Sequence, residues 1–212
     1  MPNHTFQRQS GSSKESLLDR AIDRVKPQPG PPPRPHAPAV DEGEWHKSVE
    51  RKQVVPGLTV HDVGLSVYGE TRSLHDRPGS NEPLDSARQM AAHAIINGQE
   101  LARQTGKKPP MVHPPVEPPK GVLHNPKERA AYDSSMNAAR EAYLSGHDPT
   151  QGATHFNMRP SPHRSPFEGT YPLSTQSGPY DNSFPSKNAP RHTTWLNTYL
   201  PDEIEKKQHK RK

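Results

Sequence analysis

The stretch TVHDVGLSVYGETRSL, residues 59–74, decides how the fold of this chain is interpreted. It is a short apolar pattern in a chain that otherwise consists mainly of proline, charged and small polar residues. Thr59 and Asp62 have the spacing of a helix capping box in which Asp replaces the usual Glu. Three valines lie at the spacing of one helical face, namely Val60, Val63 and Val67. The stretch therefore predicts an amphipathic helix that begins at Thr59.

Glu70 follows the last of these valines by three residues, so it continues the apolar face into the final turn of the helix. The helix dipole disfavours a carboxylate at that end. Gly69 beside it allows another backbone or a substrate to come close. Burial and the dipole both favour the neutral acid, and an acid that keeps its proton is what protonating a glycosidic oxygen requires. The alternative is a simple helix end, with Glu70 paired to Arg72 or Arg88.

The composition limits how much of the chain can fold. Only 28% of the residues are hydrophobic, the mean hydropathy is -1.08, and there are 27 prolines. Too little apolar surface is available to offset the ordering entropy of the whole chain. We therefore expect a compact domain of about 100–140 residues with disordered flanks.

The expected organisation has three parts. Residues 1–53 are predicted to form a disordered arm with a short helix and a proline-rich linker, KPQPGPPPRPHAP. Residues 54–200 form the domain, and residues 201–212 form a basic tail. Within the domain we expect a mainly α fold with long polar loops, because two further helical patterns follow, one capped by Asp85 and one running from Asn125 to Gly146. Residues 147–200 are interpreted as loops with one short hairpin at most.

Charge and residue usage exclude several classes of protein. The net charge of +5 and the pI of 9.4 permit an anionic partner without selecting one. The absence of cysteine excludes disulfides and thiolate metal sites. The 13 histidines form no HExxH motif or close pair, so we expect neither a metal nor a cofactor.

Targeting signals are also lacking. No stretch approaches the ~20 apolar residues of a membrane helix, and the first residues carry no apolar signal segment. We therefore expect synthesis in the cytoplasm. Action on a cell wall would then need non-classical export, a phage particle or delivery as a secreted effector.

Three sequence elements, in order, point to a family. They are YGETR after the first helical pattern, AIING in the second, and DPTQGATHF after the third. Together they resemble the bacterial cell-wall hydrolase family typified by spore-cortex-lytic enzymes, over roughly residues 58–160. In that family a helix ends in a Gly-Glu-Ala-Arg-Gly-Glu-like element, a small-residue helix ends in Ile-Leu-Asn-Arg, and an Ala-rich helix leads to Asp-Pro-Thr-Gly-Gly-Ala-Thr-His-Phe.

The resemblance implies a lysozyme-like helical fold and cleavage of the bond from N-acetylmuramic acid to N-acetylglucosamine in a peptidoglycan glycan strand, by hydrolysis or lytic transglycosylation. Glu70 takes the place of the catalytic acid, and Asn97 matches the family's Asn. Aromatic, amide and hydroxyl side chains are the groups that bind sugars. Thr154, His155 and Phe156 match the family's Gly-Ala-Thr-His-Phe element, so the resemblance implies that they bind substrate, as Asn97 does. The further substrate-binding candidates are Tyr68, Asn157, Tyr180 and Asn182, with Tyr171 beside them.

Two departures from the family pattern affect the mechanism. Ser73 and Leu74 stand where the second acid would fall, and Gly98 stands where the family has Arg. Three carboxylates could replace the missing acid, namely Asp76, Glu82 and Asp85, but their loop or capping positions favour a structural role. A one-acid route fits better: Glu70 protonates the leaving oxygen and then takes a proton from the muramyl 6-hydroxyl.

Two other function classes stay open. The missing second acid and the proline-rich segments are compatible with a catalytically degenerate protein that binds peptidoglycan or serves as an adaptor. The PxxP spacing of the arm could bind an SH3-like partner, although a stiff spacer explains it better. Nucleic-acid binding through the tail KKQHKRK has no recognised motif to support it, so we do not expect a nucleic-acid partner.

Overall fold

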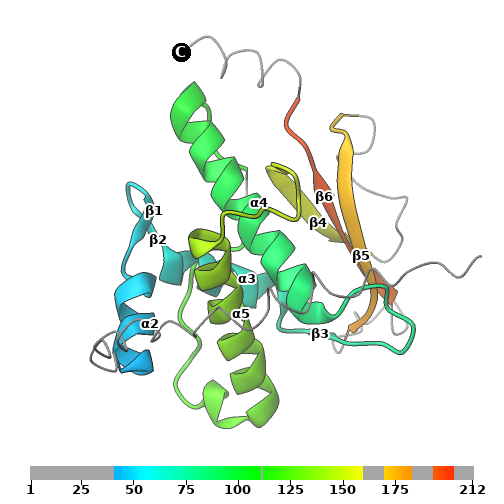
Figure 1. Cartoon of the computed structure of the whole chain (residues 1–212). Coiled ribbons are helices and arrows are strands. Elements are labelled where there is room, and N and C mark those ends of the chain that lie inside the picture. The colour runs from blue at the N-terminus through cyan, green and yellow to red at the C-terminus, as the bar shows by residue number, and fades with distance from the viewer. Residues whose placement is uncertain (1–40, 111, 160–169, 183–192, 203–212) are drawn as a thin grey trace, which may run out of the picture. The chain divides into compact units, whose positions relative to one another are not determined.

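The computed structural model describes residues 41–110, 112–159, 170–182 and 193–202 of the chain (Figure 1). All of them belong to one compact unit that begins at Asp41. The short helix and proline-rich linker expected before residue 41 lie outside the described residues, as does most of the basic tail. No helix in the described segments is long and apolar enough to cross a membrane.

The unit combines a group of helices with an antiparallel sheet (Figure 1). Helices α3 (Val60–Thr71), α4 (Leu84–Thr105) and α5 (Pro126–Leu144) pack on one another, and α4 also contacts the sheet. The sheet has the order β3 (Leu74–His75), β5 (Leu173–Asn182), β6 (Thr193–Tyr199), β4 (His155–Arg159). The remaining described elements are α2 (Glu42–Glu50), the hairpin β1 (Gln53–Val55) and β2 (Leu58–Thr59), and the 3₁₀ turn η1 (Val122–His124).

Helix α3 confirms the prediction from the opening stretch. The carboxylate of Asp62 accepts the Thr59 backbone N–H at 2.8 Å, and Thr59 Oγ1 accepts the Asp62 N–H at 3.1 Å, which completes the capping box. The three valines of the predicted face are all buried in the core, namely Val60, Val63 and Val67. The capping box thus sets the start of α3, and burial of the valine face holds it on α4 and α5.

Helices α4 and α5 were also predicted, with one error at the start of α4. Asp85 does not cap the helix; its carboxylate lies 3.0 Å from Arg88 Nη1. The backbone N–H of Leu84 is instead satisfied by Asp76 Oδ1 at 2.7 Å. Asn125 caps α5 as expected, accepting the Lys127 N–H at 2.9 Å.

The mainly α prediction is confirmed in part: the predicted helices form, but a sheet occupies much of the segment assigned to loops. Several of its buried side chains are polar, namely Ser177, Thr194, Asn197 and Thr198, beside the apolar or aromatic Leu74, Tyr180, Leu196 and Tyr199. Some of the polar side chains are bonded within the sheet, as when Gln176 Nε2 donates to Asn197 Oδ1 at 2.8 Å, whereas Asn197 Nδ2 is buried without a partner among the described residues. Because polar residues fill inward positions, the strands lack the apolar alternation by which strands are recognised. The fold is therefore mixed, with helices and antiparallel strands.

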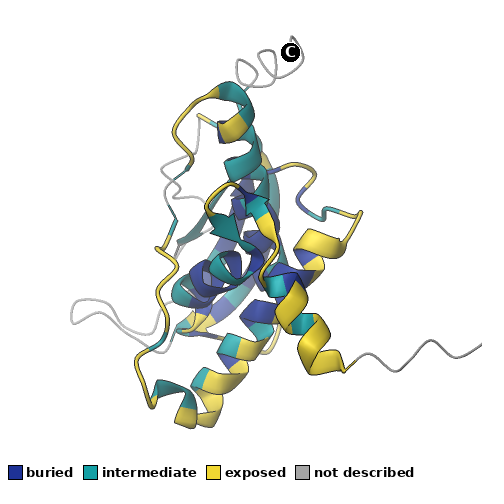
Figure 2. Ribbon diagram, turned by 90° about the vertical axis from the view of Figure 1, so that its left-hand side faces the viewer, coloured by how far each residue is buried: buried dark blue, intermediate teal, exposed yellow. Residues whose placement is uncertain are grey.

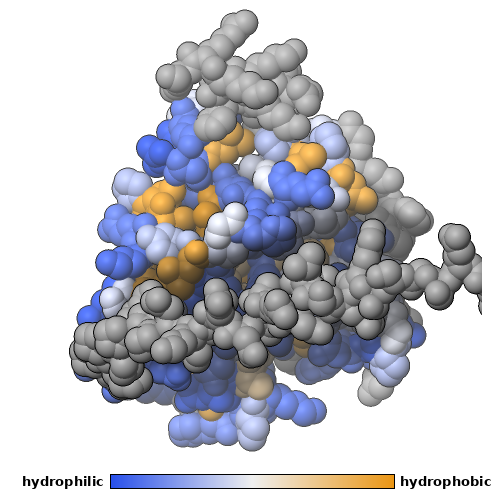
Figure 3. Space-filling model, viewed as in Figure 1, coloured by the Kyte–Doolittle hydropathy of each residue, from blue (hydrophilic) through white to orange (hydrophobic). Residues whose placement is uncertain are grey.

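Residues 42–53, assigned to the arm, form α2 and the start of β1 instead. Asp41 Oδ1 accepts the Gly43 N–H at 2.8 Å and begins the helix. Val49 reaches the core, and Glu50 forms an ion pair with Arg140 of α5. Most of α2 is exposed, unlike α3 and α4 (Figure 2). The face seen in Figure 3 has small, separate apolar patches among hydrophilic residues, as the low mean hydropathy predicts.

Candidate functional site

Glu70 lies in the last turn of α3 and is half-buried. Its Oε1 accepts the backbone N–H of His113 at 3.0 Å. A Cβ on Gly69 would lie 2.3 Å from Nδ1 of the His113 ring, so only glycine permits this close approach. The expectation that Gly69 lets another part of the chain come close is confirmed. The buried face of α3 therefore ends in a carboxylate that is only partly withdrawn from solvent.

The second proline-rich segment, residues 112–119, runs along α3 in the opposite direction. His113 contacts the C-terminal end of the helix, and Glu117 Oε1 lies 2.7 Å from Nε2 of His61 in its first turn. Val112 packs against the core. No sequence signal predicts the contact between Glu70 and His113, because it joins residues 43 apart in the chain.

Tyr68, a predicted substrate contact, is only 3% exposed. Its hydroxyl donates to Glu128 Oε2 at 2.5 Å, and its ring meets the edge of Tyr132 with the centroids 5.7 Å apart. Burial, and then the bond to Glu128, raise the pKa of the Tyr68 phenol. The substrate-binding assignment of Tyr68 is therefore wrong: the side chain joins α3 to α5 in the interior.

The DPTQGAT segment, residues 148–154, forms a folded turn, and Asn97 of α4 is bonded to it. Asp148 accepts four hydrogen bonds: from the Thr150 N–H (2.8 Å), the Thr150 hydroxyl (2.7 Å), the Gly152 N–H (2.8 Å) and Asn97 Nδ2 (2.8 Å). Burial alone would raise the pKa of Asp148, but these bonds together hold it below its usual value. Asn97 Nδ2 also donates to the Ala153 carbonyl at 3.0 Å. Asn97 thus holds the turn against α4. This structural role explains the residue without a substrate contact.

Close packing around residue 98 explains why this chain has glycine where the family has Arg. An ideal Cβ at this position would lie 2.7 Å from the carbonyl oxygen of Thr154 and 3.2 Å from the ring of Pro110. A side chain therefore cannot be placed at residue 98 while the turn stays against α4. The glycine permits the close approach of the helix to Thr154, the residue before β4.

Among the predicted residues, His155 and Tyr171 form the surface best suited to binding a sugar. Their rings are stacked, with the centroids 4.3 Å apart and an angle of 24° between the planes. Both line a hollow that also contains Thr154, Lys107 and Lys108. Thr154 Oγ1 lies 2.9 Å from His155 Nδ1, which orients the imidazole.

The remaining predicted residues are not in this hollow. Phe156 packs against the core, and Asn157 is half-buried in β4. Tyr180 is fully buried, with its hydroxyl donating to the Glu82 carbonyl at 3.0 Å, so its assignment to the glycan groove is wrong. Asn182 pairs with Leu74 at one end of the sheet, whereas His155 pairs with Tyr199 at the other. The fold therefore separates Asn182 from His155, because the predicted residues are spread along the full length of the strands.

Glu70 and the Thr154–His155 hollow are connected by one short segment. Pro110 lines the hollow and packs against Gly98, while the N–H of His113 is bonded to Glu70. Three residues of chain reach at most about 10 Å. The candidate acid and the aromatic hollow therefore lie within the length of a short oligosaccharide.

No second acid accompanies Glu70 in a hydrogen bond among the described residues. Asp76 holds the first turn of α4 and Asp85 bonds to Arg88, so both side chains have structural partners. The part of the chain that the structure describes also contains no group of three or more side chains able to hold a metal ion. The chemistry available at this site is that of one carboxyl group near a hollow lined by the rings of His155 and Tyr171, by Thr154 and by two lysines.

Acid is expected to weaken the folded turn around Asp148. His93 of α4 is buried, and its Nδ1 lies 3.6 Å from Asp148 Oδ1. Burial lowers the pKa of His93 below its ordinary 6.5; Asp148 opposes this effect and the charge of His147 adds to it. The folded state thus favours neutral His93, and this contribution is present above pH 6.5 and lost as the pH falls. Asp148, whose pKa is also lowered in the fold, adds a loss below its ordinary 3.8.

The measurement is the melting temperature by circular dichroism from about pH 7.5 down to about pH 4. We expect a decrease that starts below pH 6.5, and a smaller decrease in His93→Gln, whose side chain does not titrate. An equal decrease in both proteins would assign the acid sensitivity to other groups.

A comparison with models of known families, with curated proteins and with solved structures finds no match to this chain.

Proposed function

We propose that this chain cleaves peptidoglycan at the bond from N-acetylmuramic acid to N-acetylglucosamine, with Glu70 as the catalytic acid. The observation that carries the proposal is the placement of Glu70. It is a half-buried carboxyl group at a helix end, one short segment away from the stacked His155–Tyr171 surface. The arrangement of helices packed on a small antiparallel sheet suits a lysozyme-like fold, in which such an acid faces a glycan groove.

The proposed reaction uses one carboxyl group twice. Glu70 donates its proton to the oxygen that leaves with N-acetylglucosamine, and the bond from that oxygen to C1 of the muramyl residue breaks. The Glu70 carboxylate then takes the proton of the muramyl 6-hydroxyl, whose oxygen forms the new bond to C1. The products are a free 4-hydroxyl and a 1,6-anhydromuramyl end, and no water is consumed. A retaining or inverting hydrolase would instead need a second carboxyl group ~5–9.5 Å from the first.

The products distinguish these possibilities. We expect purified peptidoglycan treated with the protein to yield anhydromuropeptides by mass spectrometry. Reducing muramyl ends would keep the cleavage but replace transglycosylation with hydrolysis. Turbidity that stays constant, with no new ends, would overturn the proposal.

A binding protein is the second candidate. It is favoured by the lack of a second acid bonded to Glu70 and by the aromatic hollow flanked by Lys107 and Lys108. Such a protein would co-sediment with insoluble peptidoglycan without clearing it. Its proline-rich arm would then serve as an adaptor for an SH3-like partner. Clearing that depends on Glu70 would exclude this alternative.

A further inference from the structure

A second hollow lies where α3 ends and where α4 and α5 begin. Its charged lining consists of three cations, Arg72, Arg88 and Lys127, and two carboxylates, Asp76 and Asp85, with His75 at the side. The volume is about 340 Å³, at the lower end of the range for small-ligand sites. Asp76 and Asp85 were considered as second acids, but the cationic site was not predicted, because its three cations lie far apart in the sequence.

Arg88 is the buried part of this hollow. It is 6% exposed, and its guanidinium donates from Nε to Thr71 Oγ1 at 3.2 Å and from Nη1 to Asp85 Oδ1 at 3.0 Å and Ser134 Oγ at 2.9 Å. Its Nη2 has no hydrogen-bond partner among the described residues. Burial lowers the pKa of Arg88, but a guanidinium remains charged at any ordinary pH. A buried cation with an unused donor therefore borders the hollow.

The two carboxylates leave this positive charge only partly compensated. Asp76 is occupied by the Leu84 N–H that it accepts. The Asp85 side chain is 78% exposed, so solvent screens its interaction with Arg88. Ser134 donates to the same carboxylate. Each carboxylate thus already has a structural task.

Arg72 and Lys127 add two further cations from separate elements. Both are exposed, and neither forms an ion pair with another described residue. Lys127 stands in the first turn of α5, where the helix dipole also favours an anion. Excess positive charge, an unused donor on the largely buried Arg88 and a helix N-terminus therefore converge on one hollow.

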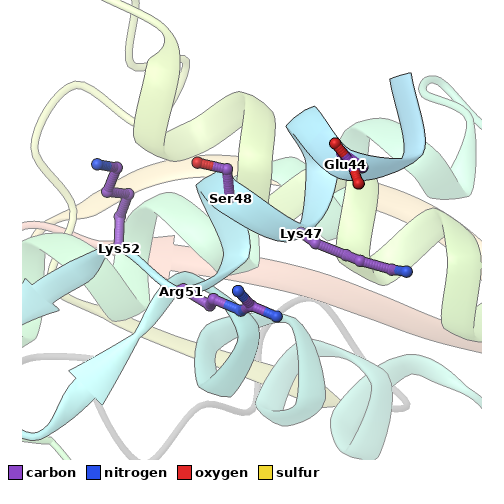
Figure 4. Close-up of a pocket in the computed structure, with 5 residues that line it drawn as sticks. All are labelled: Glu44, Lys47, Ser48, Arg51 and Lys52. Carbon is purple, nitrogen blue, oxygen red and sulfur yellow. The ribbon is translucent and has the colours of Figure 1, made fainter. Parts of the chain in front are cut away.

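A basic hollow on α2 provides a contrast. Its lining, Lys47, Arg51 and Lys52 with Glu44 and Ser48, comes from one helix and the residues just after it (Figure 4). All five of these side chains are exposed, and those of Lys47 and Lys52 point in different directions. That surface has no buried donor, so we do not assign it a ligand.

We propose that the hollow at Arg72, Arg88 and Lys127 binds a carboxylate of the peptide stem of peptidoglycan. The inference rests on the proposed function, because the hollow adjoins the end of the helix that carries Glu70, with Arg72 as its C-cap residue. Each muramyl residue carries a lactyl-linked peptide with free carboxylates, which would extend sideways from a glycan held at Glu70. A planar guanidinium matches a carboxylate in geometry as well as in charge.

The test separates carboxylate recognition from cleavage. Two probes are titrated by NMR: a free stem tetrapeptide with its carboxylates, and the same peptide with every carboxyl group amidated. Substitution of Arg88 risks misfolding, so the variant is Arg72→Gln with Lys127→Gln, which changes two exposed side chains. The control is Lys120→Gln with Arg129→Gln, which removes the same charge from neighbouring positions that do not line the hollow.

We expect the free-acid peptide to bind the wild type and the control, with shifts at residues of the hollow. The double variant should lose about tenfold or more in affinity, the usual effect of removing charge-assisted contacts. The amidated peptide should bind none of the proteins. Equal binding of both peptides, or equal loss in the control, would overturn the proposal.

A second experiment, on cleavage, distinguishes failure of the carboxylate-binding proposal from failure of the proposed function. Wild-type protein should cleave intact peptidoglycan faster than glycan strands stripped of peptide by an amidase, and Arg72→Gln with Lys127→Gln should lose this preference. Cleavage without a preference and without peptide binding would remove this inference alone. Peptide binding at the hollow without any cleavage would instead remove the proposed function and leave a peptidoglycan-binding protein.

Discussion

Gly98→Arg is expected to destabilise the protein strongly, although it restores the residue that the resemblance predicts after Asn97. The position of its Cβ is already occupied by the Thr154 carbonyl, 2.7 Å away, and by the ring of Pro110. A backbone carbonyl cannot rotate aside as a side chain can, so β4 and its preceding turn must move from α4. Overpacking of this kind costs about 1–3 kcal/mol, and a cation forced among packed residues adds to it.

Thermal unfolding measures this effect. Each kcal/mol shifts the melting temperature of a domain of this size by about 2–4 °C, so we expect a decrease of about 5–15 °C. The matched control is Gly146→Arg, because no atom lies within 4 Å of a Cβ at Gly146 and its backbone is not in the left-handed region. Melting of the two variants at the same temperature would show that α4 and the turn can separate without cost.

The packing of this turn against α4 also changes the interpretation of the DPTQGATHF motif. Asp148, Thr150 and Gly152 are used within the turn, and Asn97 is the side chain that fastens it. A motif with this role records how a chain folds, whether or not it is an enzyme. The motif is therefore explained by folding in this chain, and the proposed chemistry depends on Glu70.

Local patterns explain which parts of the fold could be predicted. The capping box at Thr59 and the cap at Asn125 are satisfied by residues two or three positions away, so the sequence alone reveals them. The strands could not be recognised, since their inward positions hold Ser177, Asn197 and Thr198, whose partners lie on neighbouring strands. Burial of polar residues depends on pairing distant segments, and a single sequence does not display that pairing.

The candidate site also contains features that local sequence spacing predicts and features that depend on contacts between distant segments. The position of Glu70 on α3 was predictable from helical spacing, and the access allowed by Gly69 from its lack of a side chain. Its partner His113 was not, nor was the burial of Tyr68 against Glu128, because both contacts join segments far apart in the chain. The hollow around Arg88 escaped prediction for the same reason. Local spacing thus located the acid, while its surroundings required the fold.

Glu70→Gln is expected to abolish peptidoglycan cleavage while the fold is kept. The Gln carbonyl oxygen can still accept the His113 N–H that Glu70 Oε1 accepts at 3.0 Å, so the second proline-rich segment should stay in place. An amide cannot donate a proton to the leaving oxygen or accept one from the 6-hydroxyl. Loss of a general acid lowers a rate by roughly 10²–10⁴-fold, and here one group performs both proton transfers.

Zymograms and turbidity assays on purified peptidoglycan measure the activity, and circular dichroism verifies the fold. Glu82→Gln is the matched control, since it removes another half-buried carboxylate whose backbone carbonyl, not its side chain, holds Tyr180. Clearing by Glu70→Gln at the wild-type rate would move the chemistry to another carboxyl group. Equal loss in both variants would instead assign Glu82 the role of the second carboxyl group and would overturn the one-acid route.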